Sequence, residues 1–152
     1  MIKYIVMDVD GTLTDGKIYM SDKGELMKAF NIKDGYGIRN IALPNGIIPV
    51  IITGRESEIV TNRAKELGVA LVYQGVSDKA EKLKDVTDNL SEVAFIGDDL
   101  NDMPCIDLVK NAGGVVGCPS DAVSEVRAKA DLIAEHKGGE GAVRDFIDWL
   151  IG

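Results

Sequence analysis

The chain has 152 residues, of which 45% are apolar and 28% are charged, and its formal net charge is −8. This length predicts one domain over residues 1–152, because domains commonly hold about 100–150 residues. The acidic balance argues against broad contact with nucleic acid or an anionic membrane surface, and no apolar run reaches the about 18 residues of a membrane span. Cys105 and Cys118 form no CxxC pair, which argues against a zinc site or a disulfide framework.

The first predicted strand covers residues 2–7 and leads directly into an acidic motif at residues 8–12. This apolar start is too short for a signal peptide, so we expect the first strand of a cytoplasmic protein. Asp8 ends the strand and can attack phosphorus, and Asp10 can protonate the leaving alcohol and then activate water. The same motif also suits a capped turn or, more weakly, a fragment of a calcium loop.

Residues 15–33 form the next predicted element, a β-hairpin. Two short extended runs flank a turn that contains Asp22 and Gly24, a composition typical of hairpin turns. Because it follows the acidic motif immediately, this hairpin must project beside it. Its apolar side chains have no evident partner within so small a domain, and such patches usually mark a contact between subunits. These side chains are Ile18, Tyr19, Met20, Leu26, Met27 and Phe30.

A second predicted strand, residues 47–52, ends at Thr53 and Gly54 and is followed by a predicted helix at 56–67. A hydroxyl and free backbone N–H groups at this turn can hold phosphoryl oxygens, although Thr53 alone could simply cap the helix. Lys79 lies at the start of another predicted helix, 78–90. By itself such a lysine is usually solvated, so its functional interpretation depends on the other motifs.

The strand predicted at residues 93–96 ends in two adjacent carboxylates, Asp98 and Asp99. Paired acids after a buried strand repel each other unless a cation holds them, so Mg²⁺ shared between Asp98 and Asp8 is the economical explanation. We expect Asp99 and Asp102 to orient Asp98 or Lys79. A local helix cap at this position is compatible with metal binding by the neighbouring carboxylate.

Further strands are predicted at 69–73, 114–116 and 131–134, and a final amphipathic helix at 140–151. Strands that alternate with helices predict an α/β fold, with a parallel sheet covered by helices on both faces. The carboxyl ends of such strands share one edge, where ligands bind. A nucleophilic carboxylate, an acid/base carboxylate, a hydroxyl, a lysine and a distal acidic pair at that edge suit phosphoryl transfer assisted by a divalent cation.

The order and spacing of these motifs resemble the haloacid dehalogenase (HAD) superfamily of phosphatases. Within it the chain is most similar to the 3-deoxy-D-manno-octulosonate 8-phosphate (KDO 8-phosphate) phosphatase family, through residues 8–19, 30–38, 52–57 and 138–144. The resemblance implies a capless, Rossmann-like HAD fold with a hairpin insert. It also implies a homotetramer in which a neighbouring subunit covers the active site, and Mg²⁺-dependent hydrolysis of a sugar-acid phosphate through an aspartyl-phosphate.

The resemblance also implies a role for individual residues. The catalytic set is Asp8, Asp10, Thr53 and Lys79, and the Mg²⁺ ligands are Asp8 and Asp98 with the backbone of Asp10. Arginine side chains suit a substrate that carries a carboxylate as well as a phosphate. The substrate-binding set is Asp10, Asn31, Lys33, Asp34, Gly35, Arg39, Gly54, Arg55, Arg63, Lys79 and Asn101.

Three alternatives share part of this pattern. Phosphatases of nine-carbon nonulosonate 9-phosphates (sialic acid or KDN) and the oligomerising C-terminal domain of some sialic-acid cytidylyltransferases have the same motifs. Receiver domains also place acidic residues at strand ends. Their phosphorylated Asp lies in the middle of the chain, whereas Asp8 lies near its start, and Asp10 offers an acid/base that a receiver lacks.

Overall fold

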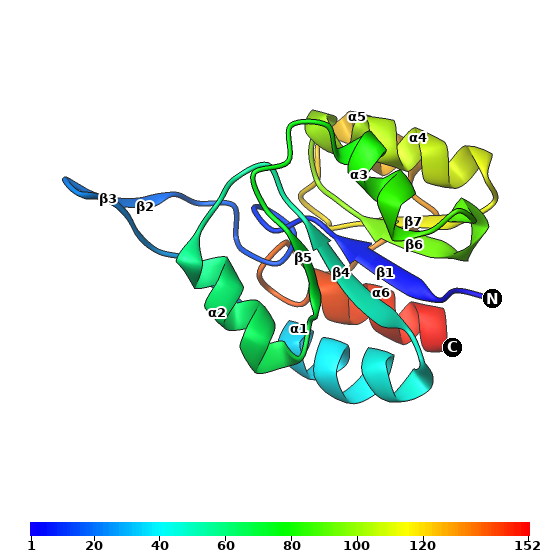
Figure 1. Cartoon of the computed structure of the whole chain (residues 1–152), viewed down its shortest axis with the longest axis horizontal. Helices are drawn as coiled ribbons and strands as arrows, with labels where there is room; N and C mark the ends of the chain where they lie inside the picture. The colour runs from blue at the N-terminus through cyan, green and yellow to red at the C-terminus, as the bar shows by residue number, and fades with distance from the viewer.

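The computed structural model describes all 152 residues and is built on a six-stranded sheet (Figure 1). All of its strand pairs are parallel, and their order is β5-β4-β1-β6-β7-β8. The strands are β1 (Tyr4–Met7), β4 (Ile48–Ile52), β5 (Leu71–Tyr73), β6 (Val93–Ile96), β7 (Val115–Cys118) and β8 (Leu132–Ile133). Each overlaps a predicted run, and β7 extends two residues beyond the run predicted at 114–116. Because the chain adds strands first on one side of β1 and then on the other, the order reverses at β1.

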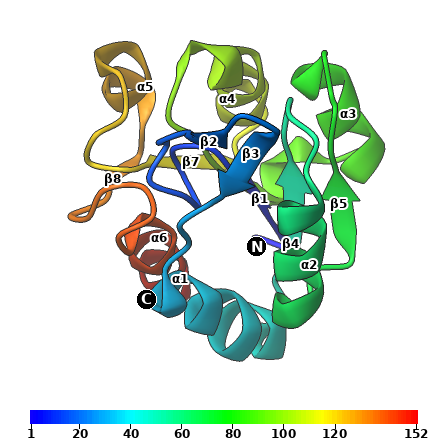
Figure 2. The same cartoon turned by 90° about the vertical axis from the view of Figure 1, so that its left-hand side faces the viewer.

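Helices cover both faces of the sheet, as predicted (Figures 1 and 2). One layer holds α1 (Ile32–Tyr36), a π-helical turn η1 (Gly37–Ala42), α2 (Glu58–Leu67) and α6 (Ala142–Ile151). The other holds α3 (Lys79–Val86), α4 (Met103–Asn111) and α5 (Ser124–Lys129). Short 3₁₀ turns lie at η2 (Leu43–Asn45), η3 (Leu90–Glu92) and η4 (Leu100–Asp102). None of the helices combines the length and the apolar run needed to cross a bilayer.

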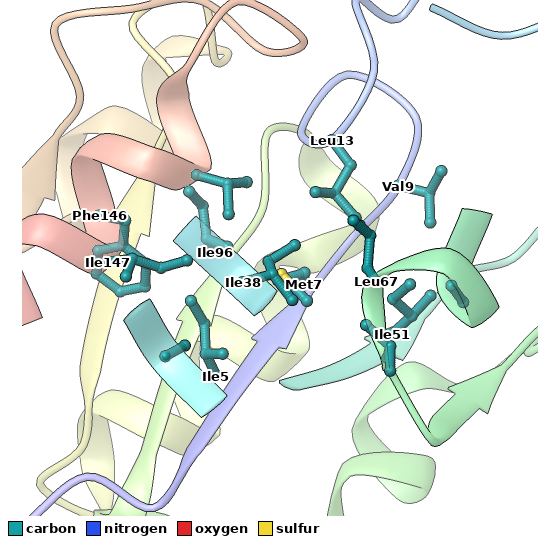
Figure 3. Close-up of a cluster of buried hydrophobic side chains, with 14 of the residues drawn as sticks. Ile5, Met7, Val9, Leu13, Ile38, Ile51, Leu67, Ile96, Phe146 and Ile147 are labelled. Atoms are coloured by element: carbon teal, nitrogen blue, oxygen red, sulfur yellow. The ribbon is translucent and has the colours of Figure 1, made fainter. Parts of the chain in front are cut away.

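The two helical layers enclose two separate hydrophobic clusters. Successive side chains of a strand point to opposite faces, so Ile5 and Met7 of β1 pack into one cluster and Val6 into the other. Figure 3 shows the first cluster, where the two β1 side chains meet Ile38 of η1 and Phe146 of α6. Burial on both faces holds the sheet rigidly, which fixes the positions of the loops at its carboxyl edge.

The predicted hairpin is present as β2 (Tyr19–Ser21) and β3 (Gly24–Met27), paired antiparallel. It projects away from the body of the molecule at the end where the loops after β1 and β4 lie (Figure 1). At its base an antiparallel bridge joins Thr14 to Phe30. Four of its apolar side chains are largely exposed, namely Ile18, Met20, Leu26 and Met27.

Candidate active site

A polar cavity of about 250 Å³ lies at the carboxyl edge of the sheet. Asp8 and Thr53 directly follow β1 and β4, and Asp98 follows the neighbouring β6 after one intervening residue, so parallel pairing brings all three to this edge. The strand order reverses at β1, in the middle of this edge. Open α/β sheets bind ligands at the carboxyl ends of the strands next to such a reversal. The cavity is lined entirely by polar side chains and glycines: Asp8, Asp10, Gly16, Thr53, Gly54, Arg55, Asp98, Asp99 and Asn101.

Lys79 lies beneath this cavity, between two carboxylates. Its Nζ donates hydrogen bonds to Oδ1 of Asp8 and to Oδ1 of Asp102, both at 2.9 Å, and all three side chains are buried. Burial alone would lower the pKa of Lys79, but the charges of Asp8 and Asp102 raise it above its usual value. The lysine is therefore a fixed cation that holds one oxygen of Asp8 and leaves the other free.

Asp102 supports the loop that follows β6. Its Oδ2 accepts the backbone N–H groups of Asp98 at 3.0 Å and Asp99 at 3.3 Å, while its Oδ1 accepts from Lys79. A Cβ on Gly97 would lie 2.5 Å from Oδ2 of Asp102, so this close approach needs glycine. Asp102 thus orients Asp98 and Lys79, as predicted from the sequence. The Asp99 side chain, predicted to share this role, instead accepts the backbone N–H of Leu100.

Asp8, Asp98 and Asp102 form a group that could hold a metal ion, with one carboxylate oxygen of each within 4.8 Å of the others. Both oxygens of Asp102 already accept hydrogen bonds, which leaves Asp8 and Asp98 as the available ligands. Burial, followed by the neighbouring Asp8, raises the pKa of Asp98 to about 9. A divalent cation would offset this repulsion, and a set of oxygen ligands favours Mg²⁺ over zinc.

The loop after β1 is packed tightly against Asp98. Gly11 has a φ of +86°, and a Cβ there would lie 2.0 Å from Oδ2 of Asp98, so only glycine fits. Thr12 donates a hydrogen bond from Oγ1 to Oδ1 of Asp98 at 3.4 Å. The loop therefore sets the distance between the end of β1 and the end of β6.

Asp10 reaches the cavity with a partly exposed side chain, and its Oδ1 accepts a hydrogen bond from Nζ of Lys28 at 2.6 Å. We did not predict Lys28 as a site residue. It lies eighteen residues from Asp10 and reaches it only because the hairpin returns to its base. No local sequence signal marks this contact.

The structure brings part of the predicted substrate-binding set to the cavity. Gly54, Arg55 and Asn101 line it together with Asp10. The Arg55 side chain is half-exposed, and its Nη2 lies 3.8 Å from a carboxylate oxygen of Glu25 in β3. Arg55 is thus the arginine placed beside the predicted phosphate turn.

Other members of that set line a second, separate cavity of about 190 Å³ between α1 and α2. Gly35, Arg39 and Arg63 contribute to its wall. Nη1 of Arg39 donates to the carbonyl oxygen of Glu66 at 2.5 Å, and Arg63 lies over the ring of Phe30 at 5.7 Å from its centre. Within one chain these two arginines do not join Arg55.

The last three members, Asn31, Lys33 and Asp34, line neither cavity. Oδ1 of Asn31 caps α1 by accepting the N–H of Lys33 at 2.8 Å, and Lys33 itself is exposed. Asp34 is buried, and its Oδ1 accepts the backbone N–H of Arg144 at 2.9 Å. Asp34 therefore ties α1 to α6 in this chain.

No family model matches the sequence. The 3-deoxy-D-manno-octulosonate 8-phosphate phosphatase of Escherichia coli strain K12 is 42% identical over 154 residues, which cover 99% of this chain and 79% of the relative. The chain is also similar to two solved structures of such phosphatases.

The first, from Moraxella catarrhalis in complex with a magnesium ion, a phosphate ion and a KDO molecule, has 40% identity and a TM-score of 0.90. The match covers 99% of this chain and 86% of that one. The second, the cobalt-bound form from Haemophilus influenzae, has 32% identity, a TM-score of 0.91 and coverages of 99% and 87%.

Proposed function

The chain belongs to the 3-deoxy-D-manno-octulosonate 8-phosphate phosphatase family, and from this premise we propose that it hydrolyses that sugar-acid phosphate with Mg²⁺ as its cofactor. The observation that carries the proposal is the buried Asp8–Lys79 pair beside Asp98, facing the same cavity as Asp10. Identity of 40–42% to phosphatases of the eight-carbon ester favours this substrate over nine-carbon esters and over an oligomerising domain without activity.

Two carboxylates share the chemistry in this proposal. An oxygen of Asp8 attacks phosphorus, the bond from phosphorus to the sugar oxygen breaks, and that oxygen takes a proton from Asp10. Water then attacks the aspartyl-phosphate and gives a proton to Asp10, which frees phosphate and Asp8. Lys79 holds Asp8 in position, and Thr53 and the N–H of Gly54 hold phosphoryl oxygens. Mg²⁺, held by Asp8, Asp98 and the Asp10 backbone, supplies positive charge for the phosphoryl group when bound.

Substrate recognition is divided between two subunits in this proposal. Arg55, Gly54 and Asn101 of one chain contact the sugar acid in their own cavity. The second cavity serves the site of a neighbouring subunit in a homotetramer, and the exposed apolar side chains of the hairpin support such an assembly. Of the residues assigned to this contribution, Gly35, Arg39 and Arg63 line the second cavity. Asn31, Lys33 and Asp34 contribute through α1, which forms one wall of that cavity.

The proposal extends to the protein's setting. Residues 1–152 act as one hydrolase domain with a hairpin insert at about 15–33, and the protein works in the cytoplasm. Its partners are the small sugar-acid phosphate and further copies of itself, not nucleic acid or membranes. The net charge of −8 supports the last point, because an acidic surface repels both polyanions.

Phosphate release from 3-deoxy-D-manno-octulosonate 8-phosphate by the purified protein tests this function. We expect turnover with Mg²⁺, its loss on exhaustive chelation, and no turnover by Asp8→Asn protein whose circular dichroism matches the wild type. A nine-carbon 9-phosphate, tested in parallel, should give a lower kcat/KM. Near-normal turnover by folded Asp8→Asn protein would exclude the covalent mechanism, and preference for the nine-carbon ester would exclude the proposed substrate.

A further inference from the structure

Lys28, just after β3, is a buried cation that the chemistry described so far does not use. Its side chain is only 3% exposed, although it lies at the base of a hairpin that otherwise projects from the protein. Nζ donates to Oδ1 of Asp10 at 2.6 Å and to Oε2 of Glu25 at 2.9 Å. A desolvated ammonium at this position is therefore matched by two carboxylates.

The backbone around Lys28 holds it in place. The bridge between Thr14 and Phe30 closes the hairpin two residues beyond Lys28, and β2 pairs with β3 on its other side. The hairpin thus returns the chain to the loop that carries Asp10. Glu25, three residues before Lys28, also lies near Arg55 of the same cavity.

A gain in the stability of the fold is a weak explanation for the contact of Lys28 with Asp10 and Glu25. Replacing a buried ion pair with apolar side chains is often neutral or stabilising, because desolvation offsets the attraction between the charges. The contact does have a geometric consequence at the cavity. Lys28 is the only side chain that hydrogen-bonds Asp10, and it engages Oδ1, so the carboxylate cannot rotate freely and Oδ2 is left without a side-chain partner.

We propose that Lys28 is a positioning residue for proton transfer by Asp10. Its ammonium fixes Oδ1 of Asp10, so that the other oxygen is held toward the leaving-group oxygen in the first step and toward water in the second. The proposal rests on the role given to Asp10 in the proposed function. It assigns the hairpin base a part in the chemistry of its own chain, separate from any contact with a neighbouring subunit.

Leaving groups that differ in their need for a proton test this role. An alkyl phosphate requires protonation of its leaving oxygen, whereas p-nitrophenyl phosphate releases a stable anion. Lys28→Met should therefore lower kcat/KM for the octulosonate ester, and for a simple alkyl phosphate, by roughly 10²-fold, within the range that acid–base catalysis contributes. For p-nitrophenyl phosphate, kcat/KM should fall less than about threefold, because it reports steps up to release of the aryl group.

A second readout follows the other half of the reaction. If water activation by Asp10 is also slowed, the phosphorylated Lys28→Met enzyme should accumulate and give a burst of about one p-nitrophenol per active site. Lys28→Arg, which keeps the charge, should restore most of the alkyl phosphatase activity. Lys84→Met is the matched control, because Lys84 makes the same i,i+3 pair with Glu81 on an exposed helix face. That control should behave as the wild type.

The outcomes separate this inference from the proposed function. Equal losses on alkyl and aryl esters, or no loss on either, would overturn the role of Lys28, because a structural lysine would not distinguish leaving groups. Thermal unfolding of each variant identifies a fold defect. If Lys28→Met fails to fold, Lys28→Gln, which removes the charge but keeps a polar side chain, is judged by the same ratio of alkyl to aryl ester. A wild type that cleaves a simple alkyl phosphate but not the octulosonate ester would refute the proposed substrate, while the alkyl-to-aryl ratio still decides on Lys28.

Discussion

The buried ammonium group of Lys79 lies beside more carboxylates than its single positive charge can neutralise. One ammonium faces Asp8 and Asp102, and Asp98 lies in the same group of carboxylates. Burial, and after it the negative charge of Asp102, raises the pKa of Asp8 above its usual value. The Asp8 carboxyl group therefore resists ionisation when no cation is bound beside it. Such an arrangement does little for stability by itself. The divalent cation that we propose at Asp8 and Asp98 would remove the excess negative charge, and this would explain why the carboxylates are placed together.

Asp34 should make the stability of the protein depend on pH. Burial raises its pKa from 3.8 to about 6, so the folded protein binds this proton more tightly than the unfolded chain does. The stabilisation is complete below about pH 4 and is lost as the pH rises through about 6. The difference corresponds to roughly 3 kcal/mol. Most of this difference is lost between pH 4 and pH 7. Over that range the free energy of unfolding of Asp34→Asn protein should therefore fall by roughly 2.5 kcal/mol less than that of the wild type.

Urea unfolding of both proteins at a series of pH values measures this difference. Asn keeps an acceptor for the N–H of Arg144 but places an amide where Oδ2 of Asp34 is buried without a partner. That change adds an offset that does not vary with pH, so the slope is the informative quantity. Parallel stability curves for the two proteins would contradict the assignment to Asp34.

The loop before α6 acts as a support for the loop after β1. The N–H of Gly139 donates to the carbonyl oxygen of Thr12 at 3.2 Å, and the N–H of Gly138 donates to Oδ1 of Asp121 at 3.0 Å. A Cβ on Gly138 would lie 1.9 Å from the carbonyl oxygen of Gly11. Gly11 in turn lies against Asp98, so any displacement at Gly138 passes to this proposed metal ligand.

Gly138→Ala should therefore impair catalysis as well as folding. The added methyl group must push Gly11 away, and a misplacement of about 1 Å in an active site can lower the rate about 10²-fold. Gly46→Ala is the control: Gly46 has a φ of +78° and open space around it, so Ala there adds backbone strain of roughly 1–2 kcal/mol far from the site. Turnover per folded molecule and thermal unfolding, measured for both variants, distinguish a defect in catalysis from a loss of stability. Gly138→Ala protein with wild-type kcat would contradict a supporting role.

Helices and strands whose apolar residues recur with a clear period could be predicted from the sequence. Elements that form because of tertiary packing could not. The strands and the helices α2 and α6 follow their apolar patterns closely, whereas α3 ends at Val86, four residues before the predicted end of its helix. The helical stretch from α1 to η2 was not predicted, because Gly35 and Gly37 lower its helix propensity. Packing overrides that propensity: a Cβ on Gly37 would lie 3.0 Å from the side chain of Arg144 and 3.2 Å from that of Ile147, so α6 lies directly on the glycine.

The same distinction holds for the site. Asp8, Thr53 and Asp98 follow strands, and parallel strands bring their carboxyl ends to one edge, so the sequence alone predicts that they meet. Lys28 depends on the return of a hairpin, and the second cavity depends on how α1 lies against α2. Neither arrangement has a local pattern, because each arises from contacts between distant segments.

At the scale of the whole molecule, the hairpin is the element whose apolar side chains remain exposed within one chain. Viewed from that end, β2 and β3 lie in front of the sheet, and the helical layers do not cover them (Figure 2). Ile18, Met20, Leu26 and Met27 are each about half exposed or more. A two-stranded hairpin is marginally stable alone, so burial against another subunit would give this one its stability.

We therefore expect the protein to assemble, with a tetramer as the predicted state, through contacts that include the hairpin. Leu26→Asp places a charge on its exposed apolar surface and should shift sedimentation velocity toward smaller species. It should also lower kcat/KM, because Arg39 and Arg63 of a neighbour would then leave the site that they serve. Ile151→Asp, which changes an exposed apolar side chain at the end of α6, is the matched control and should leave the assembly intact. A wild-type monomer with full activity at assay concentrations would contradict both the assembly and the shared recognition of substrate.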